Sequence, residues 1–161
     1  MRAAPDLILG EFPRTLDERF RVALPAELAG PLTPIEPVCI LAKERPGCLS
    51  LWDATAWKTR FDNGVELVRG KIKAGRLEGR LEEVQLLGRL LSTRHKTVEL
   101  GDRSRLLIPD GFREFLGAEA GSEVLLVGAA VCVEIWNPRA WLAHLETNME
   151  QFPKLFDQLS S

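Results

Sequence analysis

The chain has 161 residues, of which 45% are hydrophobic and 27% charged, and its formal net charge is -2. This composition predicts one globular domain or two small fused halves and excludes disordered and collagen-like chains. No apolar run approaches the roughly 20 residues of a membrane span, and the first residues lack a signal-peptide layout, so we expect a cytoplasmic protein without a membrane partner.

The three cysteines, Cys39, Cys48 and Cys132, lie among aliphatic residues. Their number is odd and none forms a CxxC pair, so we expect neither a disulfide framework nor a metal site. A thiol in such surroundings behaves as a small apolar group, which fits a reducing compartment.

The first part of the chain alternates short apolar segments with turn-forming residues. Its expected elements, in order, are a strand at 13–16, a polar turn at 17–20, a strand at 21–24, a short helix at 26–28, and strands at 38–42 and 49–52. Asp53 then predicts the N-cap of a helix whose inner face carries Trp57.

An insert between residues 58 and 96 has the periodicity of an amphipathic helix, with apolar side chains at three- and four-residue steps. These are Leu77, Leu81, Val84, Leu87 and Leu91. We expect this helix to pack on a sheet or on a partner.

From Arg69 to Arg105 there are ten Lys and Arg against five Asp and Glu, so the middle of an acidic chain is cationic. That charge fits either a binding surface or a solvated helix face.

The third part repeats the first at a fixed offset of 84 positions over about 43 residues. The matched pairs are Leu16 with Leu100, Arg19 with Arg103, Arg21 with Arg105, Pro25 with Pro109, Cys48 with Cys132, Trp52 with Trp136, and Trp57 with Trp141. A repeat of this kind indicates a duplicated folding unit. We expect strands at 97–100, 105–108, 123–127 and 131–136, a helix at 110–116, and an N-cap at Asn137 before Pro138.

The chain therefore divides into a first module at 1–57, a helical insert at 58–96, a second module at 97–145 and a helical tail at 146–161. The tail has apolar residues at helical steps, interrupted by Pro153, and fits an exposed helix that needs a partner. Two such modules form a pseudo-two-fold object in which each copy covers the sheet edges of the other.

The turns of the two modules carry the candidate binding residues, which are Arg14, Arg19, Arg21, Arg103 and Arg105. A guanidinium can donate two hydrogen bonds to a phosphate or to the edge of guanine. A two-fold symmetric object matches the local two-fold symmetry of duplex DNA. These arginines fit equally well as solvated side chains paired with Asp17, Glu18 and Asp102.

The segments TLDERFRVALPAEL and VELGDRSRLLIPDGFREFL, with GEFPRTLD before them and LSLW and VEIW after them, resemble the MraZ family of transcription regulators. The resemblance covers about residues 10–145. It implies an α/β (α+β) fold of two tandem AbrB-like swapped-hairpin modules in a pseudo-two-fold barrel with flanking helices. It also implies ring-like homo-oligomers, a nucleoid location and DNA binding at short direct repeats upstream of the division and cell-wall gene cluster, where we expect repression.

The family carries an Asp-x-x-x-Arg motif in each half. Asp17 and Arg21 complete the first motif, whereas Gly101 stands at the acidic position of the second and Asp102 comes one residue late. The glycine usual before the motif arginine is replaced by Phe20 and Ser104. Because that glycine permits a tight turn, Phe20 should adopt the turn only at a cost.

Three other functions compete with DNA binding through the arginines. The first is a diverged family member that acts as an oligomeric protein-interaction module with weak or no DNA binding. The second is a single-module AbrB-type antitoxin regulator, against which the duplication argues. The third is an enzyme, but His95 and His144 have no nucleophile or carboxylate at a recognised spacing, so we expect no catalytic residues, cofactor or small-molecule substrate.

Overall fold

The computed structural model describes residues 7–161, so residues 1–6 of the expected first module lie outside it. Its main element is a six-stranded sheet in which every neighbouring pair is antiparallel. In spatial order the strands are β1 (Glu11–Thr15), β7 (Glu123–Gly128), β8 (Val133–Trp136), β4 (Cys48–Asp53), β3 (Val38–Arg45) and β5 (His95–Glu99). The fold is thus a mixed α/β one with an antiparallel sheet.

The strand order has an internal symmetry that follows the sequence repeat. Exchanging β1 with β5, β3 with β7 and β4 with β8 turns the order β1-β7-β8-β4-β3-β5 into its own reverse. The edge strand of each half pairs with the other half, since Glu11 is opposite Val127 and Val38 is opposite Glu99. Neither half therefore completes its sheet alone.

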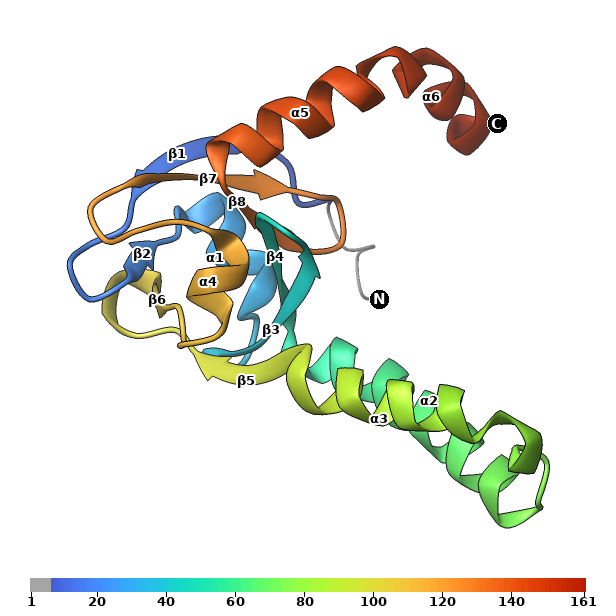
Figure 1. Cartoon of the computed structure of the whole chain (residues 1–161). Coiled ribbons are helices and arrows are strands. Elements are labelled where there is room, and N and C mark those ends of the chain that lie inside the picture. Colours follow the sequence, from blue (N-terminus) through green and yellow to red (C-terminus); the bar gives the residue numbers. More distant parts are fainter. Residues whose placement is uncertain (1–6) are drawn as a thin grey trace.

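A second, two-stranded sheet joins the halves again, because β2 (Arg21–Ala23) pairs with β6 (Arg105–Leu107). The six-stranded sheet curves around helices α1 (Ala26–Leu32) and α4 (Phe112–Leu116), and β2 and β6 lie on the open side (Figure 1). The buried core draws on both halves at equivalent positions, including Val22 with Leu106, Leu24 with Ile108 and Leu28 with Phe112. The predicted strands and short helices are present within a few residues of their expected ends.

Two helical arms leave the body. One consists of α2 (Ala54–Lys73), the short 3-10 turn η1 (Glu78–Arg80) and α3 (Leu81–Thr93), and the other of α5 (Pro138–Asn148), the 3-10 turn η3 (Met149–Gln151) and α6 (Phe152–Ser160). The predicted caps are present: the Asp53 carboxylate accepts from the Thr55 amide at 3.1 Å and the Asn137 side chain from the Arg139 amide at 3.0 Å.

The arms differ from the sequence prediction in one respect. The insert is not one helix packed along a sheet, because the helix capped by Asp53 continues for 20 residues and forms an extended hairpin with α3 (Figure 1). Periodicity locates α3, but the weakly amphipathic, Gly-containing segment at 58–73 gave no comparable signal. Among the described residues, no helix is long and apolar enough to cross a membrane.

All three cysteines are buried and free, as the sequence predicts. Burial raises the pKa of Cys39 to about 11 and that of Cys132 to about 12, and it also raises the pKa of Cys48. The thiols are therefore protonated and act as small apolar side chains in the sheet.

Candidate nucleic-acid interface

The two arginine-bearing turns lie at the two ends of the short β2–β6 sheet, because the strands are antiparallel and each turn comes directly before one of them. The Ile108 amide donates to the Phe20 carbonyl at 2.9 Å, and the equivalent Leu24 amide donates to the Ser104 carbonyl at 3.1 Å. Each turn is therefore joined to the strand of the other half. The backbone thus brings the residues 17–21 and 101–105 to one end of the body (Figure 1).

Asp17 organises the first turn. One carboxylate oxygen accepts from the Arg19 and Arg21 amides at 2.8 and 2.9 Å, and the other accepts from Arg21 Nε at 2.8 Å. These hydrogen bonds, that of the Arg21 amide first, lower the pKa of Asp17 below its ordinary value. The carboxylate therefore stays ionised at neutral pH and holds both the turn and the Arg21 guanidinium.

The second turn reaches a similar shape without a carboxylate at the first position. The Gly101 amide donates to the Arg105 carbonyl at 2.9 Å, as the Asp17 amide does to Arg21. Arg105 Nε donates to the backbone carbonyl of Asp102 at 3.2 Å rather than to its side chain. The two turns thus share this backbone hydrogen bond and differ in the group that orients the arginine. They also differ in backbone conformation, because φ is positive at both Arg103 and Ser104 but only at Phe20 in the first turn.

Four of the five predicted arginines gather at this end. Arg19 and Arg103 are exposed, Arg21 and Arg105 are half-buried, and none of the four except Arg21 forms an ion pair within residues 7–161. Arg14 stands apart on β1, where its guanidinium lies 5.7 Å from the Phe12 ring centroid.

The positions before the motif arginines adopt the left-handed backbone conformation, with φ of 59° at Phe20 and 56° at Ser104. This confirms the inference that a glycine would be the unstrained residue there. Phe20 offsets its strain by packing against the core, and the guanidinium of Arg113 lies 4.2 Å from its ring centroid.

Arg113 is a residue that the sequence reasoning missed. Besides covering Phe20, it donates to the Ile108 carbonyl at 2.7 Å and forms an ion pair with Asp110 at 2.9 Å. It thereby ties α4 to the first turn and to the residue that follows β6. The only signal in the sequence was the large aromatic residue at a glycine position, which requires a partner for its exposed face.

Replacing Ser104 by Gly should raise the free energy of unfolding by about 1 kcal/mol, because glycine adopts a positive φ without strain. Urea denaturation followed by circular dichroism measures this change. Ser122→Gly is the matched control, since Ser122 has no positive φ and donates to the Glu119 carbonyl. The control should lower stability, and a loss of stability in Ser104→Gly as well would contradict the strain argument.

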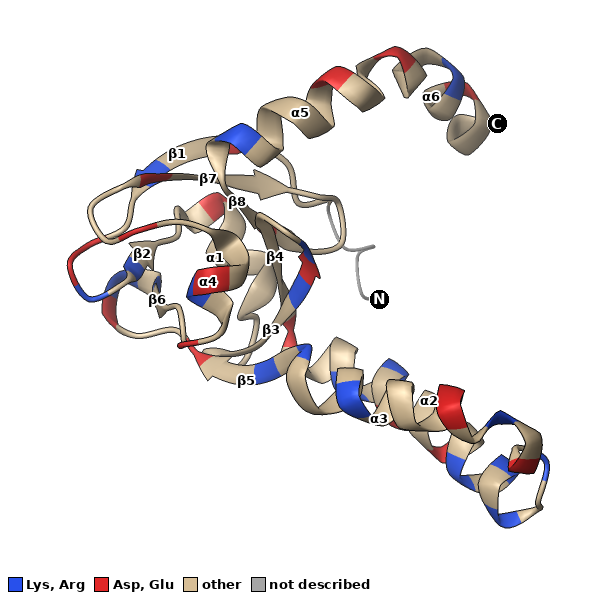
Figure 2. Ribbon diagram, in the orientation of Figure 1, with Lys and Arg blue, Asp and Glu red and all other residues tan. Residues whose placement is uncertain are grey.

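Acidic side chains accompany the arginines at this end of the molecule. Both signs of charge occur around β2, β6 and α4 (Figure 2). Phe20 and Arg113 line a shallow surface depression together with Asp110, Glu114 and Glu119. The arginines therefore form a cationic rim beside an acidic patch rather than a uniformly basic face.

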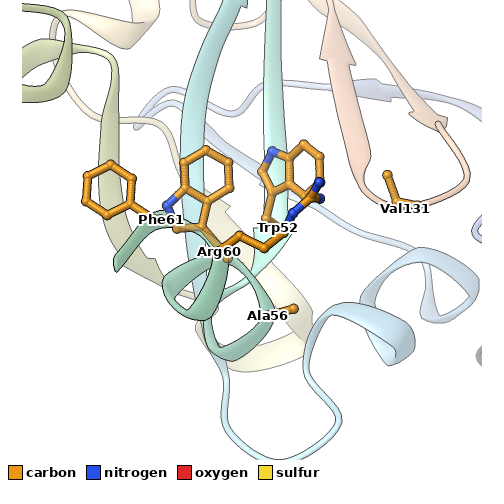
Figure 3. Close-up of a pocket in the computed structure, with 6 residues that line it drawn as sticks. Trp52, Ala56, Arg60, Phe61 and Val131 are labelled. Atoms are coloured by element: carbon orange, nitrogen blue, oxygen red, sulfur yellow. The ribbon is translucent and has the colours of Figure 1, made fainter. Parts of the chain in front are cut away.

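A second concave region lies at the base of the first arm. This pocket of about 300 Å³ is lined by Trp52, Ala56, Trp57, Arg60, Phe61 and Val131. Trp52 comes from β4 and Arg60 and Phe61 from α2, and Val131 faces them from the β7–β8 turn (Figure 3). His95 adjoins the pocket, 4.8 Å from Phe61 between ring centroids, and burial followed by the charge of Arg94 lowers its pKa. The walls are apolar, with Arg60 as the charged group among the described lining residues, which suits an apolar contact.

Comparison with known proteins relates the chain to one family over nearly its whole length. The family model "MraZ protein, putative antitoxin-like" matches residues 93–159. A protein of Roseiflexus castenholzii named Transcriptional regulator MraZ is 30% identical over 156 residues, covering 95% of this chain and 99% of that protein. The protein of the same name from Thermus thermophilus is 28% identical over 144 residues, covering 89% of this chain and 91% of its own length.

Among solved structures, the solution structure of PHS018 from Pyrococcus horikoshii covers 81% of this chain and 89% of its own, with a TM-score of 0.31 and 12% identity. That likeness is too weak to bear on fold or function. The 30% identity to the Roseiflexus castenholzii protein extends over nearly the full length of both chains, and the family model matches the second half of this one. The chain belongs to the MraZ family.

Proposed function

We propose that this chain is a DNA-binding transcription regulator whose paired turns form its DNA contact. The single observation that carries the proposal is the placement of Arg19, Arg21, Arg103 and Arg105 at one end of the body, two from each half. Guanidinium groups arranged in this way can contact successive phosphates or base edges of a duplex. Arg14 would add a contact beside the turns, and Asp17 would hold Arg21 in position.

The family's two tandem swapped-hairpin modules would supply the two-fold frame for this contact. The exchange of edge strands between halves and the self-reversing strand order support that interpretation. Within the frame, Asp102 would act through its backbone carbonyl, since that group and not its carboxylate contacts Arg105.

A single chain offers few phosphate contacts, and its overall charge of -2 opposes a duplex. Useful affinity would therefore require a homo-oligomer, in which several subunits engage repeated sites and the first contact raises the effective concentration of the next. We propose a ring-like assembly in the cytoplasm, associated with the nucleoid, that represses the division and cell-wall gene cluster through repeats in its promoter. No catalytic step, cofactor or small-molecule substrate enters this mechanism.

The proposal is tested by mixing the full-length chain with sheared genomic DNA and sequencing the retained fragments. Binding of the recovered double-stranded fragments should then be measured from about 50 to 200 mM salt. We expect the logarithm of the binding constant to fall linearly with the logarithm of salt concentration, by about 0.9 for each phosphate contacted. Enrichment of no fragment and no salt-dependent complex would contradict the proposal.

The acidic residues beside the turns favour a second candidate function, a diverged member that acts as an oligomeric protein-interaction module. Asp110, Glu114 and Glu119 would weaken any duplex contact at the depression next to Phe20. This candidate predicts an assembled protein that forms no complex with DNA at any of the salt concentrations above.

A further inference from the structure

The first arm has an apolar groove that the chain itself leaves uncovered. The groove, of about 650 Å³, lies between α2 and α3 and is lined by Phe61, Val65, Val68, Ile72, Leu87 and Leu91, with Arg60, Arg69 and Lys73 at its edges. Within residues 7–161, Ala54 is the only buried residue in either helix. A helical hairpin with an exposed apolar interior is typical of a binding site for another helix.

The second arm carries a helix with a matching apolar face. Phe152, Leu155, Phe156 and Leu159 occupy positions i, i+3, i+4 and i+7 of α6, and each is at least half exposed. This spacing is the anchor pattern of a helix that lies in a hydrophobic groove. No residue of α6 is buried within residues 7–161, and the Phe152 and Phe156 rings lie 5.7 Å apart between centroids on its exposed face.

Charge also matches between the two surfaces. In the described part of the chain, the groove lining contains three cations and no carboxylate, and Arg69 alone of the three has an ion pair, with Glu66 at 3.5 Å. The segment 146–161 carries Glu146, Glu150 and Asp157 against the single cation Lys154. Glu146 and Glu150 precede α6, and α6 itself carries one charge of each sign, so the tail as a whole is acidic and the groove is basic. This difference in charge favours association of tail with groove over pairing of two grooves or two tails.

The topology keeps the tail of a chain away from its own groove. The arms follow β4 and β8, which are antiparallel neighbours with Cys48 opposite Trp136 and Leu51 opposite Val133. The C-terminal ends of antiparallel neighbours point in opposite directions along the strands. The helices α2 and α5, which follow β4 and β8, therefore leave the sheet in different directions (Figure 1). The occupant of the groove must come from another molecule.

We propose that α6 of one copy of this chain binds in the α2–α3 groove of a second copy. The contact is head-to-tail, because it joins two different surfaces, and such contacts build a ring or an open chain of subunits. The proposal identifies the interface of the homo-oligomer in the proposed function and rests on it. It also explains why both arms expose apolar side chains at helical spacing.

Two exposed positions allow the contact to be broken without disturbing the fold of the subunit. Ile72, in the groove, is 51% exposed and Phe156, in the tail, is 60% exposed in the single chain. Ile72→Asp and Phe156→Asp should each convert the assembled protein to monomers, as measured by size-exclusion chromatography with light scattering. Ile35→Asp is the matched control, because Ile35 is 89% exposed in the loop before β3 and should keep the assembled mass.

An equimolar mixture of the two variants identifies the contact as tail-in-groove. Each variant retains one intact surface, so the mixture should form a 1:1 heterodimer and nothing larger, while circular dichroism of each remains native. A native protein that is monomeric, a variant that keeps the assembled mass, or a mixture that stays monomeric would overturn the proposal. The measurement contains no DNA, so its failure is distinct from a failure of DNA binding.

Discussion

Replacing Arg21 and Arg105 together by alanine should lower the affinity for the selected DNA fragments by about 30-fold or more, since two well-placed arginine contacts at about 1–3 kcal/mol each are worth at least about 2 kcal/mol together. The salt dependence should weaken as well, by about 0.9 in slope for each phosphate that the variant no longer neutralises. In an oligomer the affinity losses of the engaged subunits should multiply and the losses of slope should add, because every engaged subunit lacks two guanidinium groups. Filter binding over a salt series measures affinity and slope in one experiment.

The control for this variant must change the charge equally and leave the turns intact. Lys58 and Arg139 are both exposed and lie at the starts of α2 and α5, so Lys58→Ala with Arg139→Ala removes the same charge elsewhere. We expect this control to retain most of the affinity. If the Arg21 and Arg105 variant binds like the control, with the same salt slope, the DNA-binding surface lies elsewhere on the molecule.

Trp136→Ala should cost about 3–5 kcal/mol of the free energy of unfolding, which is the usual cost of truncating a buried aromatic residue. Trp136 is 1% exposed, lies 5.2 Å from Trp141 between ring centroids and donates to Glu134 at 3.0 Å. Its removal leaves a cavity between β8 and α5 that the rigid sheet cannot close. Chemical denaturation of the full chain measures the loss.

Trp52 provides an internal control, since it occupies the equivalent position in the other half. It is only half-buried and lines the open pocket at the base of the first arm (Figure 3). Its indole donates to Ser50 at 2.8 Å. Trp52→Ala should therefore cost less, about 1–2 kcal/mol. Equal losses in the free energy of unfolding for Trp52→Ala and Trp136→Ala would show that burial does not determine the cost of removing the side chain.

The strands and short helices of the two halves were predictable because residues that match at one fixed offset indicate the same element twice. Identical positions such as Trp52 and Trp136, or Pro25 and Pro109, occur where the same strand ends or helix starts must form twice. The caps at Asp53 and Asn137 followed from local hydrogen bonding alone. Local rules were sufficient for these elements because neighbouring residues determine them.

The arms and the pairing between halves were less accessible to sequence reasoning. The length of α2 depends on a segment with Gly64 and Gly70 that has little helical preference, so its continuation to Lys73 had no clear pattern. The pairing of β1 with β7 joins residues more than 100 positions apart, which no local preference encodes. Arg113 was missed for the same reason, since its partner Phe20 lies in the other half.

The interlocked sheet has a consequence for the synthesis of the chain. Glu11 pairs with Val127, so β1 emerges from the ribosome 116 residues before its only described neighbour, an interval of roughly 6 to 20 s at ordinary elongation rates. During that time the nascent first half presents unsatisfied strand edges and apolar side chains, as a chaperone substrate does. Translation must pass β8 before the polypeptide can bury these edges. Folding of the first half of the chain therefore depends on residues that the ribosome adds late.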